Sequence, residues 1–560
     1  MERIWLEHYP PGVAKDLDLD PQETLVDSFE STVAAWADHP AFHNLGHTLT
    51  YADIDQLTLQ FAAYMQNDLG LQPGDRVAIM MPNLLQYPVA LFGCLRAGLI
   101  VVNVNPLYTA RELEHQLVDS GAKALVVYAG SAHVFAEVKH ATDVEHVLVT
   151  EPGDLLPRFR RLLVNAVVRY VRRIIPAYSI PEAKKFRSIL AARVGAYRRP
   201  EKLTGKDVAI LQYTGGTTGL AKGAMLSHSN LLANVTQVNA WFGGSDEPGK
   251  EIIVTALPLY HVYALTVNCL AYFEKGGLNI LITDPRDTAG FIKEMSNWPM
   301  TALTGVNTLF QSLVRHPDFP SLDFSTLKVV AAGGMAMQEA TAREWVAITG
   351  IQVIEGYGLS ETSPVVSSNP IGIAEFNGSI GMPLPLTDVS IRDEDGAEVA
   401  AGEAGELYVS GPQVMLGYWN KPEATAEAMK VDGFLQTGDM ATIDERGYLR
   451  IVDRKKDMII VSGFNVYPNE IENIVTQHPD VLEAAVIGVP DDDGDEDEVV
   501  KLFAVLREGA TIDAQQLRAW CKENMAAYKV PRLVEFRDEL PKSNVGKVLR
   551  RELRDEPAVE

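Results

Sequence analysis

Residues 213–224 read YTGGTTGLAKGA, and the rest of the chain can be interpreted around this stretch. It contains four glycines, three threonines and one lysine, and the apolar run VAIL at 208–211 leads into it. Glycine lets the backbone approach a ligand closely and turn its N–H groups toward an anion, while threonine hydroxyls and a lysine ammonium add donors. The pattern predicts a buried strand, a phosphate-binding loop, and then a strand or a helix.

The spacing of this loop differs from that of the P-loop, GxxxxGK[ST]. Gly216 stands five residues before Ala221, which takes the place of the second glycine, and Lys222 is followed by Gly223 instead of serine or threonine. A mobile surface loop is the alternative interpretation of so many glycines. The order of glycines, threonines and lysine favours a phosphate loop of another kind.

Composition indicates an ordinary globular protein with more than one domain. Of the 560 residues, 47% are hydrophobic and 22% are charged, as is typical of globular proteins, and the length exceeds what a single core organises. Acidic residues outnumber basic ones by 74 to 49, so the net charge is −25, which argues against nucleic-acid binding. Cys94, Cys269 and Cys521 are far apart and fit neither a metal site nor a disulfide framework, so a reducing, cytoplasmic compartment is expected.

The pattern of apolar segments predicts an α/β fold. Within residues 25–150, apolar runs at 77–81, 99–104 and 124–127 alternate with segments of helical spacing. Strands that are apolar throughout are typical of parallel sheets covered by helices. The same alternation resumes from residue 205 to about residue 400. Residues 388–452 instead alternate apolar and polar positions, which predicts half-buried antiparallel strands.

Residues 155–199 form a basic amphipathic segment in an acidic chain. Glu182 is its only acidic residue, apolar residues lie between its first arginines, and Pro176 ends the helical pattern. One interpretation is a membrane-surface helix attracted to anionic lipid; the other is a surface helix packed on the core with its basic face in water. The N-terminus does not resemble a signal peptide, and no apolar run approaches the length of a membrane span. Any membrane contact is therefore expected to be peripheral, at the inner face of the cytoplasmic membrane.

Four further motifs join the glycine-rich loop. They are IEGYGLSET at 354–362, GFLQTGD at 433–439, GYLRIVDRKKD at 447–457 with VSGFNVYP at 461–468, and PKSNVGKVLRREL at 541–553. Taken singly, Glu361 could start a helix, Asp439 could lie in a turn after Gly438, and Lys547 could be a solvated lysine. Their occurrence together favours a common function.

In this order, the motifs resemble those of the adenylate-forming superfamily of acyl-CoA ligases, adenylation domains and luciferases. The resemblance extends from about residue 25 to residue 555, and residues 432–472 and 541–553 are most similar to the bacterial long-chain-fatty-acid–CoA ligases. It implies a large domain over 1–453 with α/β sheets and a small β-barrel-like subdomain, a hinge at 454–457, and a small, mobile α+β domain over 458–560. The basic segment at 155–199 resembles an insert of these ligases.

The reaction implied by the resemblance has two half-steps. A fatty carboxylate attacks the α-phosphorus of ATP, giving acyl-adenylate and pyrophosphate, and coenzyme A then displaces AMP. The first half-step brings together two anions, so positive charge and backbone donors are needed where charge builds up. Lys547, Glu361 and Thr214 are the implied catalytic residues, with Glu361 and Thr214 holding Mg²⁺.

The resemblance also implies the binding sites. The ATP or AMP site comprises Tyr213, Thr214, Gly215, Gly216, Thr217, Thr218, Gly219, Lys222, Gly334, Gly356, Tyr357, Gly358, Thr362, Asp439, Arg454 and Lys547. The acyl pocket comprises His261, Tyr263 and Gly333. Ser462, Gly463 and Phe464 are expected to contact coenzyme A, and Lys456 is expected to be the hinge.

Several alternatives remain open from the sequence. A medium-chain or aryl acid–CoA ligase would have the same motifs, as would an enzyme that loads a carrier protein in trans. A catalytically inactive nucleotide-binding or scaffold protein is disfavoured because Lys547, Glu361, Asp439 and Arg454 are all present. A homodimer is possible.

Overall fold

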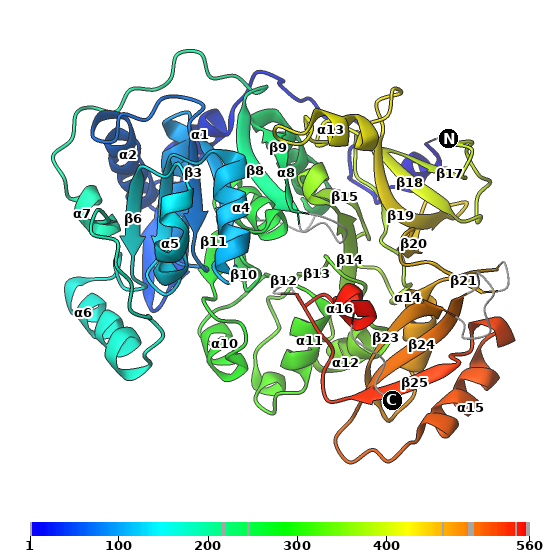
Figure 1. Ribbon diagram of the computed structural model, residues 1–560. Helices are drawn as coiled ribbons and strands as arrows, with labels where there is room; N and C mark the ends of the chain where they lie inside the picture. Colours follow the sequence, from blue (N-terminus) through cyan, green and yellow to red (C-terminus); the bar gives the residue numbers. More distant parts are fainter. Residues whose placement is uncertain are drawn as a thin grey trace.

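Two large sheets of mainly parallel strands form the body of the structure (Figure 1). The computed structural model describes residues 3–214, 220–243, 247–461, 464–490, 498–543 and 546–555. The strand order of the first sheet is β7-β6-β5-β3-β4-β8-β9. Its strands are β3 (Arg76–Met80), β4 (Ile100–Val104), β5 (Ala124–Tyr128), β6 (His146–Thr150), β7 (Lys184–Lys185), β8 (Val208–Thr214) and β9 (Lys222–Ser227).

The first sheet is parallel up to β8, and its last pair, β8 and β9, is antiparallel. The predicted buried strands at 77–81, 99–104 and 124–127 are thereby confirmed. A strand, not a helix, follows the glycine-rich loop. The helices around this sheet are α1 (Leu25–Trp36), α2 (Tyr51–Asn67), α3 (Gln86–Arg96), α4 (Ala110–Ser120), α5 (Ala132–Val138), α6 (Arg158–Ala166) and α7 (Phe186–Leu190), with η2 (Lys139–Ala141) and the π-helical η3 (Val167–Val171).

Helix boundaries in this part follow from capping residues. Thr50 and Thr109 each form a capping box, with Asp53 at the start of α2 and with Glu112 at the start of α4. Each box satisfies N–H groups that would otherwise lack partners. α4 ends at Gly121, whose φ of 60° lies in the left-handed region that glycine adopts without strain.

The second sheet has the order β16-β15-β14-β13-β12-β10-β11-β1-β2 and is parallel from β14 to β1. Its strands are β1 (Pro40–Asn44), β2 (His47–Thr50), β10 (Ile252–Thr255), β11 (Leu278–Leu281), β12 (Ala302–Gly305), β13 (Val329–Ala332), β14 (Val353–Gly358), β15 (Val365–Ser368) and β16 (Met382–Pro383). The accompanying helices are η1 (Ile4–Glu7), α8 (His228–Phe242), η4 (Ala264–Ala271), α9 (Tyr272–Glu274), α10 (Thr288–Met295), α11 (Asn307–Val314), η5 (Phe319–Ser321), α12 (Glu339–Thr349) and η6 (Ser360–Thr362).

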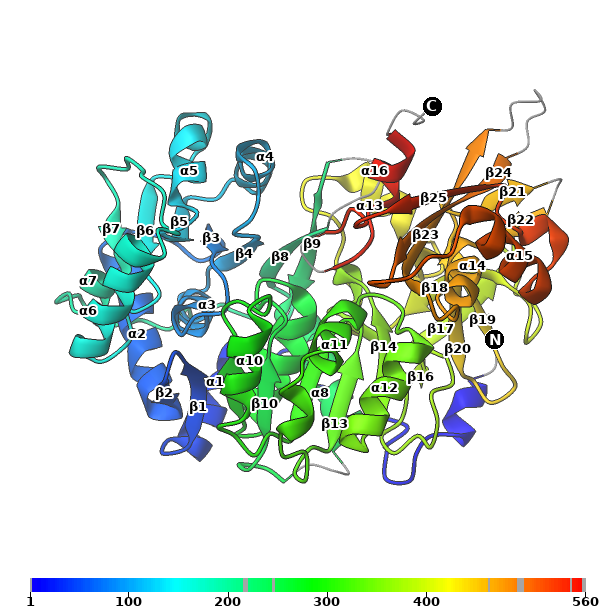
Figure 2. The ribbon, with the colours of Figure 1, turned by 90° about the horizontal axis from the view of Figure 1, so that it is seen from below.

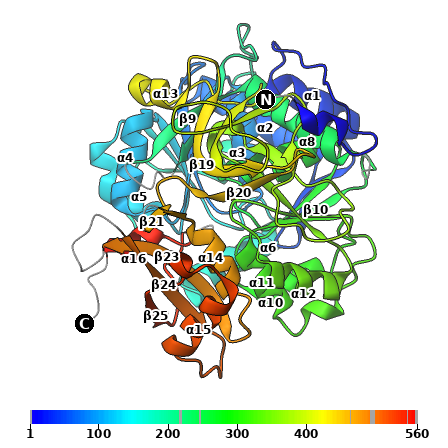
Figure 3. The same ribbon diagram turned by 90° about the vertical axis from the view of Figure 1, so that its right-hand side faces the viewer.

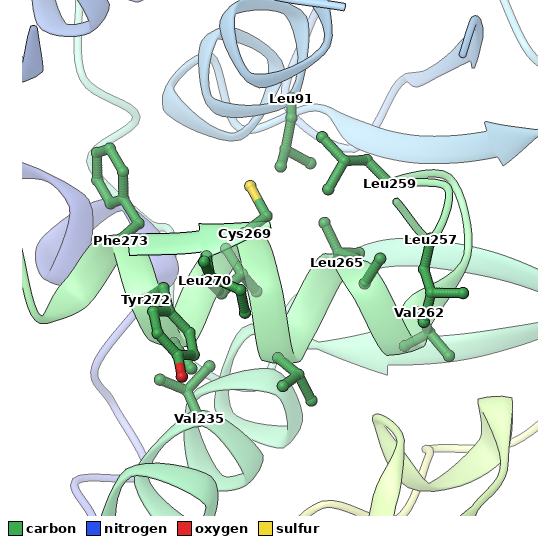
Figure 4. Close-up of a cluster of buried hydrophobic side chains, with 14 of the residues drawn as sticks. Leu91, Val235, Leu257, Leu259, Val262, Leu265, Cys269, Leu270, Tyr272 and Phe273 are labelled. Atoms are coloured by element: carbon green, nitrogen blue, oxygen red, sulfur yellow. The ribbon is translucent and has the colours of Figure 1, made fainter. Parts of the chain in front are cut away.

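The π-helical η4 and the following α9 run through the centre of the main core (Figure 4). Their side chains meet Leu91 of α3 on one side and Val235 of α8 on the other (Figure 4). Cys269 and Leu265 of η4 are fully buried there. The same core continues under both large sheets and the antiparallel sheet that follows, so these parts pack as one unit.

Residues 388–454 form an antiparallel sheet in the order β17-β18-β19-β20. This confirms the antiparallel pattern read from the sequence. Its strands are β17 (Asp388–Arg392), β18 (Gly405–Ser410), β19 (Leu435–Ile443) and β20 (Leu449–Arg454), and α13 (Pro422–Ala428) lies before β19.

Residues from Ile459 onward build separate cores on the two faces of a small sheet, β23-β24-β25. This part lies below the β17–β20 sheet and beside α11 and α12 (Figures 1 and 3). Its elements are β21 (Ile459–Val461), β22 (Phe464–Val466), α14 (Pro468–Val475), β23 (Val481–Pro490), β24 (Glu498–Leu506), α15 (Ala514–Asn524), η7 (Ala527–Lys529), β25 (Leu533–Arg537) and α16 (Arg550–Asp555).

Candidate active site

The antiparallel pair β8–β9 carries the glycine-rich loop. Thr214 and Lys222 are opposite each other at the end of this pair from which the loop leaves. The predicted ligands Gly215, Gly216, Thr217, Thr218 and Gly219 lie outside the described residues. The hydroxyl of Tyr213 donates to Asp119 of α4 at 2.8 Å, so this side chain points toward α4. Thr214 and Lys222 therefore flank the predicted phosphate loop.

Three of the predicted nucleotide residues meet where β14 approaches β19 and β20. Tyr357 of β14 donates its hydroxyl to Oδ2 of Asp439 at 2.5 Å, and Nε of Arg454 lies 3.0 Å from Oδ1 of the same carboxylate. Asp439 and Arg454 are cross-strand partners. Asp439 lies inside strand β19 and is buried, so the alternative of a turn residue is wrong.

This cluster has a defined protonation pattern. Burial and the neighbouring Asp439 carboxylate raise the pKa of Tyr357 well above its ordinary value, so the phenol remains a donor. The guanidinium of Arg454 carries N–H donors and no acceptor. After accepting from these two donors, the Asp439 carboxylate can still accept further hydrogen bonds, such as those from ribose hydroxyl groups.

Gly333, Gly356 and Gly358 lie where neighbouring segments of the chain approach one another closely. A Cβ atom at Gly358 would lie 2.0 Å from the carbonyl oxygen of Pro364, and one at Gly333 would lie 3.0 Å from the ring of Tyr263. The same Gly333 position faces the carbonyl of Gly356 at 3.4 Å. The end of β13, where Gly334 has a φ of 78°, is thus next to both the predicted adenine motif and the predicted acyl pocket.

The segment LPLYHVYAL at 257–265 forms one wall of this region. Leu257, Leu259 and Val262 point into the main core (Figure 4), which leaves His261 and Tyr263 partly exposed between them. The Tyr263 hydroxyl donates to the carbonyl of Ala331 at 3.2 Å. Burial lowers the pKa of His261 to about 4, so the imidazole is neutral near pH 7 and suits an apolar pocket wall.

Glu361 lies in η6, and its neighbour Thr362 is fully buried. The hydroxyl of Tyr418 donates to Oε1 of Glu361 at 2.8 Å. Burial raises the pKa of Glu361, and the Tyr418 hydrogen bond opposes that rise. The Thr362 hydroxyl is engaged with the carbonyls of Leu359 and Pro364, so in this arrangement it secures the η6 turn.

Lys547 enters the site from the C-terminal part of the chain. Its backbone N–H donates to the hydroxyl of Ser543, and the preceding Gly546 packs against Thr308 of α11. Burial and the Arg454 guanidinium lower the pKa of Lys547 to about 8, while Asp439 opposes this effect. Lys547 is therefore half-buried and within electrostatic reach of the Asp439–Arg454 pair, although it lies in the C-terminal part of the chain.

The predicted hinge lies beside an ion cluster. Lys456 is exposed; close by, Nη2 of Arg550 donates to Glu472 at 2.8 Å, and Nη1 lies 3.7 Å from Asp453 and 3.5 Å from Asp457. Asp453 is fully buried, which raises its pKa to about 6. The predicted coenzyme A residues Ser462 and Gly463 lie outside the described residues, as does the side chain of Phe464.

The sequence did not point to Tyr418 or Thr308. Tyr418 belongs to the run GYWN at 417–420, and aromatic residues after a glycine in a polar region are a weak signal at best. Thr308 has no motif around it. Both are recognised only through their partners on distant elements.

The residues of this site fit a magnesium ion held mainly by ATP. Within the described residues there is no group of three or more His, Cys, Asp or Glu side chains that could hold a metal. The available donors are the carboxylate of Glu361 and the hydroxyl of Thr214. Mg²⁺ commonly binds through one or two protein oxygens together with substrate phosphates, which matches this sparse set.

The chain belongs to the family of AMP-binding enzymes. The family matches residues 29–419, and the C-terminal domain of AMP-binding enzymes matches residues 470–547. The chain is 56% identical over 557 residues to the long-chain-fatty-acid–CoA ligase of Escherichia coli O157:H7, covering 99% of this chain and 98% of that protein.

Solved structures of similar shape agree with this family. The anthranilate CoA ligase AuaEII in complex with anthranoyl-AMP has a TM-score of 0.84 and 25% identity, with 96% of this chain and 98% of that chain covered. The ATP-bound MatB from Rhodopseudomonas palustris has a TM-score of 0.81 and 30% identity, with 95% and 98% covered.

Proposed function

We propose that this protein is an AMP-forming long-chain-fatty-acid–CoA ligase that works through an acyl-adenylate. The observation that carries the proposal is the position of Lys547, which lies on the C-terminal part and is half-buried within electrostatic reach of the Asp439–Arg454 pair of the large domain. A lysine in this place brings a compact positive charge to the junction of the predicted nucleotide and acyl regions. The full-length similarity to long-chain-fatty-acid–CoA ligases supports the substrate class.

In the first half-step, a carboxylate oxygen of the fatty acid attacks the α-phosphorus of ATP, and the bond to the β-phosphate breaks. Asp439 and Arg454 hold the ribose, and Tyr357 lies along the adenine. Thr214, Lys222 and the loop between them hold the β- and γ-phosphates and then the leaving pyrophosphate. Lys547 bridges the carboxylate and the α-phosphate, where negative charge gathers.

Glu361 and Thr214 would hold Mg²⁺, which would add positive charge at the phosphates. No protein side chain becomes phosphorylated in this reaction. Their work is to place two anions next to each other and to offset the repulsion between them, which is the main requirement of this chemistry.

In the second half-step, the thiolate of coenzyme A attacks the acyl carbonyl, and AMP leaves. We propose that the C-terminal domain turns about Lys456 between the half-steps, so that Lys547 leaves and Ser462, Gly463 and Phe464 approach coenzyme A. His261, Tyr263 and Gly333 form the wall between the acyl pocket and the route of the thiol. The neutral imidazole of His261 and the Tyr263 ring suit that apolar contact.

The decisive experiment measures the two half-reactions separately in Lys547→Ala. We expect ATP–pyrophosphate exchange to fall by a factor of about 100 or more, as when a group that stabilises transition-state charge is removed, while thioester formation from supplied acyl-adenylate is retained. Lys542→Ala is the matched control, because Lys542 lies in the same turn region and pairs with Glu483 at the surface. Full exchange activity in Lys547→Ala would contradict the proposal.

Chain-length preference needs its own measurement. Thioester formation from ATP and coenzyme A is followed with acids of graded chain length and with aryl acids. We expect the highest kcat/KM with long-chain acids. A clear preference for medium-chain or aryl acids, or transfer only to a carrier protein, would assign one of the alternative activities.

We further propose that α6 and η3 contact an anionic membrane surface. No helix among the described residues combines the length and hydropathy needed to cross a membrane, so the contact is peripheral. α6 lies at the outer edge of the part of the protein that is built around the first sheet (Figures 1 and 2). Phe159, Tyr170 and Val171 are 79%, 72% and 74% exposed, and Leu162, Leu163 and Ile174 are exposed as well.

This pattern differs from that of a helix packed on the core with its basic face in water. Val164 and Val168 face the core, whereas most apolar side chains of the segment face outward. Arg158, Arg172 and Arg173 are exposed next to them and form no ion pairs within the described structure. Apolar side chains ringed by arginines suit a bilayer interface with anionic lipid, and each basic residue there contributes about 1 kcal/mol.

Flotation with vesicles tests this contact. We expect binding to vesicles that contain anionic lipid, weaker binding to neutral vesicles, and loss of binding in Arg158→Gln/Arg172→Gln/Arg173→Gln. The matched control, Arg286→Gln/Arg343→Gln/Arg446→Gln, neutralises three exposed arginines outside the segment. Absence of binding to anionic vesicles, or equal binding of the two triple variants, would contradict the membrane proposal.

A further inference from the structure

We propose that Tyr418 is a positioning residue that fixes Glu361 and Lys222 relative to each other at the phosphate end of the site. This inference rests on the proposed function, because Glu361 and Lys222 are assigned there to Mg²⁺ and to the phosphates. Tyr418 belongs to none of the motifs that carry the resemblance. Its role follows from contacts with two elements that are distant in sequence.

Tyr418 uses different parts of its side chain for the two partners. Its hydroxyl donates to Oε1 of Glu361 at 2.8 Å, and the ammonium of Lys222 lies 5.1 Å from the centre of its ring. The hydrogen bond to a charged acceptor restricts the rotamer of the carboxylate. The ring face attracts the ammonium, which restrains the flexible lysine side chain at the end of the glycine-rich loop.

The backbone of Tyr418 is itself fixed to β9, the strand that leaves this loop. Residues 415–419, which we call the crossing segment, form hydrogen bonds on both sides of Tyr418: Met225 N–H donates to the Gly417 carbonyl at 2.9 Å, and Trp419 N–H donates to the Gly223 carbonyl at 2.8 Å. The N–H of Tyr418 donates to the Thr425 hydroxyl at 2.9 Å. The ring therefore has a fixed base next to Lys222.

The other end of the crossing segment is attached to η6. The N–H of Met415 donates to the backbone carbonyl of Glu361 at 2.8 Å. Glu361 is thus held twice by the same segment, once through its backbone and once through its side chain. A shift of β9 relative to η6 would break these contacts, so Tyr418 keeps the candidate metal carboxylate and the candidate phosphate lysine at a set separation.

The chemical consequence concerns the complex with Mg²⁺ and ATP. A residue that orients a metal-binding carboxylate typically changes metal affinity or activity by about 10- to 100-fold when it is removed. The effect should be confined to steps in which the phosphates and Mg²⁺ take part. The second half-step, in which coenzyme A displaces AMP, uses neither pyrophosphate nor its metal.

The test compares Tyr418→Phe, which keeps the ring and removes the hydroxyl, with the wild type. ATP binding is measured by calorimetry with Mg²⁺ and, separately, with a chelator. We expect the gain in ATP affinity on adding Mg²⁺ to shrink by about 10- to 100-fold, while ATP binding in the chelator stays within about twofold of the wild type. Pyrophosphate exchange should fall in parallel, and thioester formation from supplied acyl-adenylate should stay close to the wild-type rate.

Tyr9→Phe is the matched control, because it removes a partly buried hydroxyl that donates to the carbonyl of Pro383 at 2.7 Å and lies outside the predicted site. We expect Tyr9→Phe to keep the full Mg²⁺-dependent gain. The proposal is overturned if Tyr418→Phe also keeps the full gain, or if Tyr418→Phe lowers both half-reactions to the same extent. Failure of the wild type to form acyl-adenylate would count against the proposed function, whereas the binding comparison judges Tyr418 in either case.

Discussion

Gly546→Ala should separate the two half-reactions, because it obstructs only the arrangement in which Lys547 is in the site. Gly546 has a φ of 80°. A Cβ atom there would lie 2.4 Å from the hydroxyl oxygen of Thr308 on α11. The turn that delivers Lys547 therefore contacts the large domain at a point where an added Cβ atom would force Thr308 or the turn to shift.

The expected magnitude has two parts. An alanine in the left-handed region costs about 1–2 kcal/mol, and this cost applies wherever the C-terminal domain stands. The collision with Thr308 adds about 1–3 kcal/mol, the usual range for an overpacked site, and applies only when Lys547 is in place. The collision alone should slow adenylation by about 5- to 150-fold, at about 1.36 kcal/mol for each factor of ten.

Two variants isolate these parts. Gly509→Ala places an alanine at a φ of 82° with no atom within 4 Å of the new Cβ, so it reports the backbone cost without a collision. Thr308→Ala combined with Gly546→Ala removes the colliding hydroxyl, and we expect it to restore much of the lost rate, as a double-mutant cycle of contacting residues would.

The assays are ATP–pyrophosphate exchange for the first half-reaction and thioester formation from supplied acyl-adenylate for the second. We expect Gly546→Ala to reduce exchange strongly and thioester formation little. Equal losses in both assays, or a loss of exchange no larger than that in Gly509→Ala, would show that this contact does not define the adenylating arrangement.

Three further outcomes are expected. The pKa of Lys547 is lowered to about 8, so its ammonium group loses its proton at a lower pH than that of an ordinary lysine. The kcat/KM for exchange should therefore fall as pH rises through about 8. Lys547→Arg should move this fall to higher pH because a guanidinium stays charged. Identical pH profiles would contradict the assignment. Lys456→Pro, which restricts the predicted hinge, should spare pyrophosphate exchange more than thioester formation, and equal losses would count against a hinge there. Asp439→Asn removes the charge that pairs with Arg454 and accepts from Tyr357; calorimetry should show ATP affinity reduced by about 10- to 100-fold, the scale of a hydrogen bond to a charged group, and unchanged affinity would exclude a role in nucleotide binding.

Local patterns were sufficient to predict many elements of the fold. The stretch 388–452, predicted to hold antiparallel strands, begins with β17 and β18, because the alternation of apolar and polar residues depends only on neighbours along the chain. The strand after the glycine-rich loop could not be told from a helix, since a short apolar run fits both.

The sequence motifs identified candidate residues of the site but not how these residues are arranged in space. The motifs contain Asp439 and Arg454, but the glycine before Asp439, Gly438, also made a turn a reasonable interpretation of Asp439. The structure places Asp439 within β19, opposite Arg454 on β20. Tyr418 was missed because its contacts join segments that no local pattern relates.

The sequence by itself determined which segments are apolar, which loop is rich in phosphate-binding groups, and which charged residues accompany it. These properties are fixed by side-chain chemistry and short-range spacing. Only the tertiary structure decided that most apolar side chains of α6 face outward, that Lys547 lies within electrostatic reach of Asp439 and Arg454, and that Tyr418 joins Glu361 to Lys222. Such relations depend on how distant elements pack against each other, and periodicity along one segment does not encode the partner that covers it.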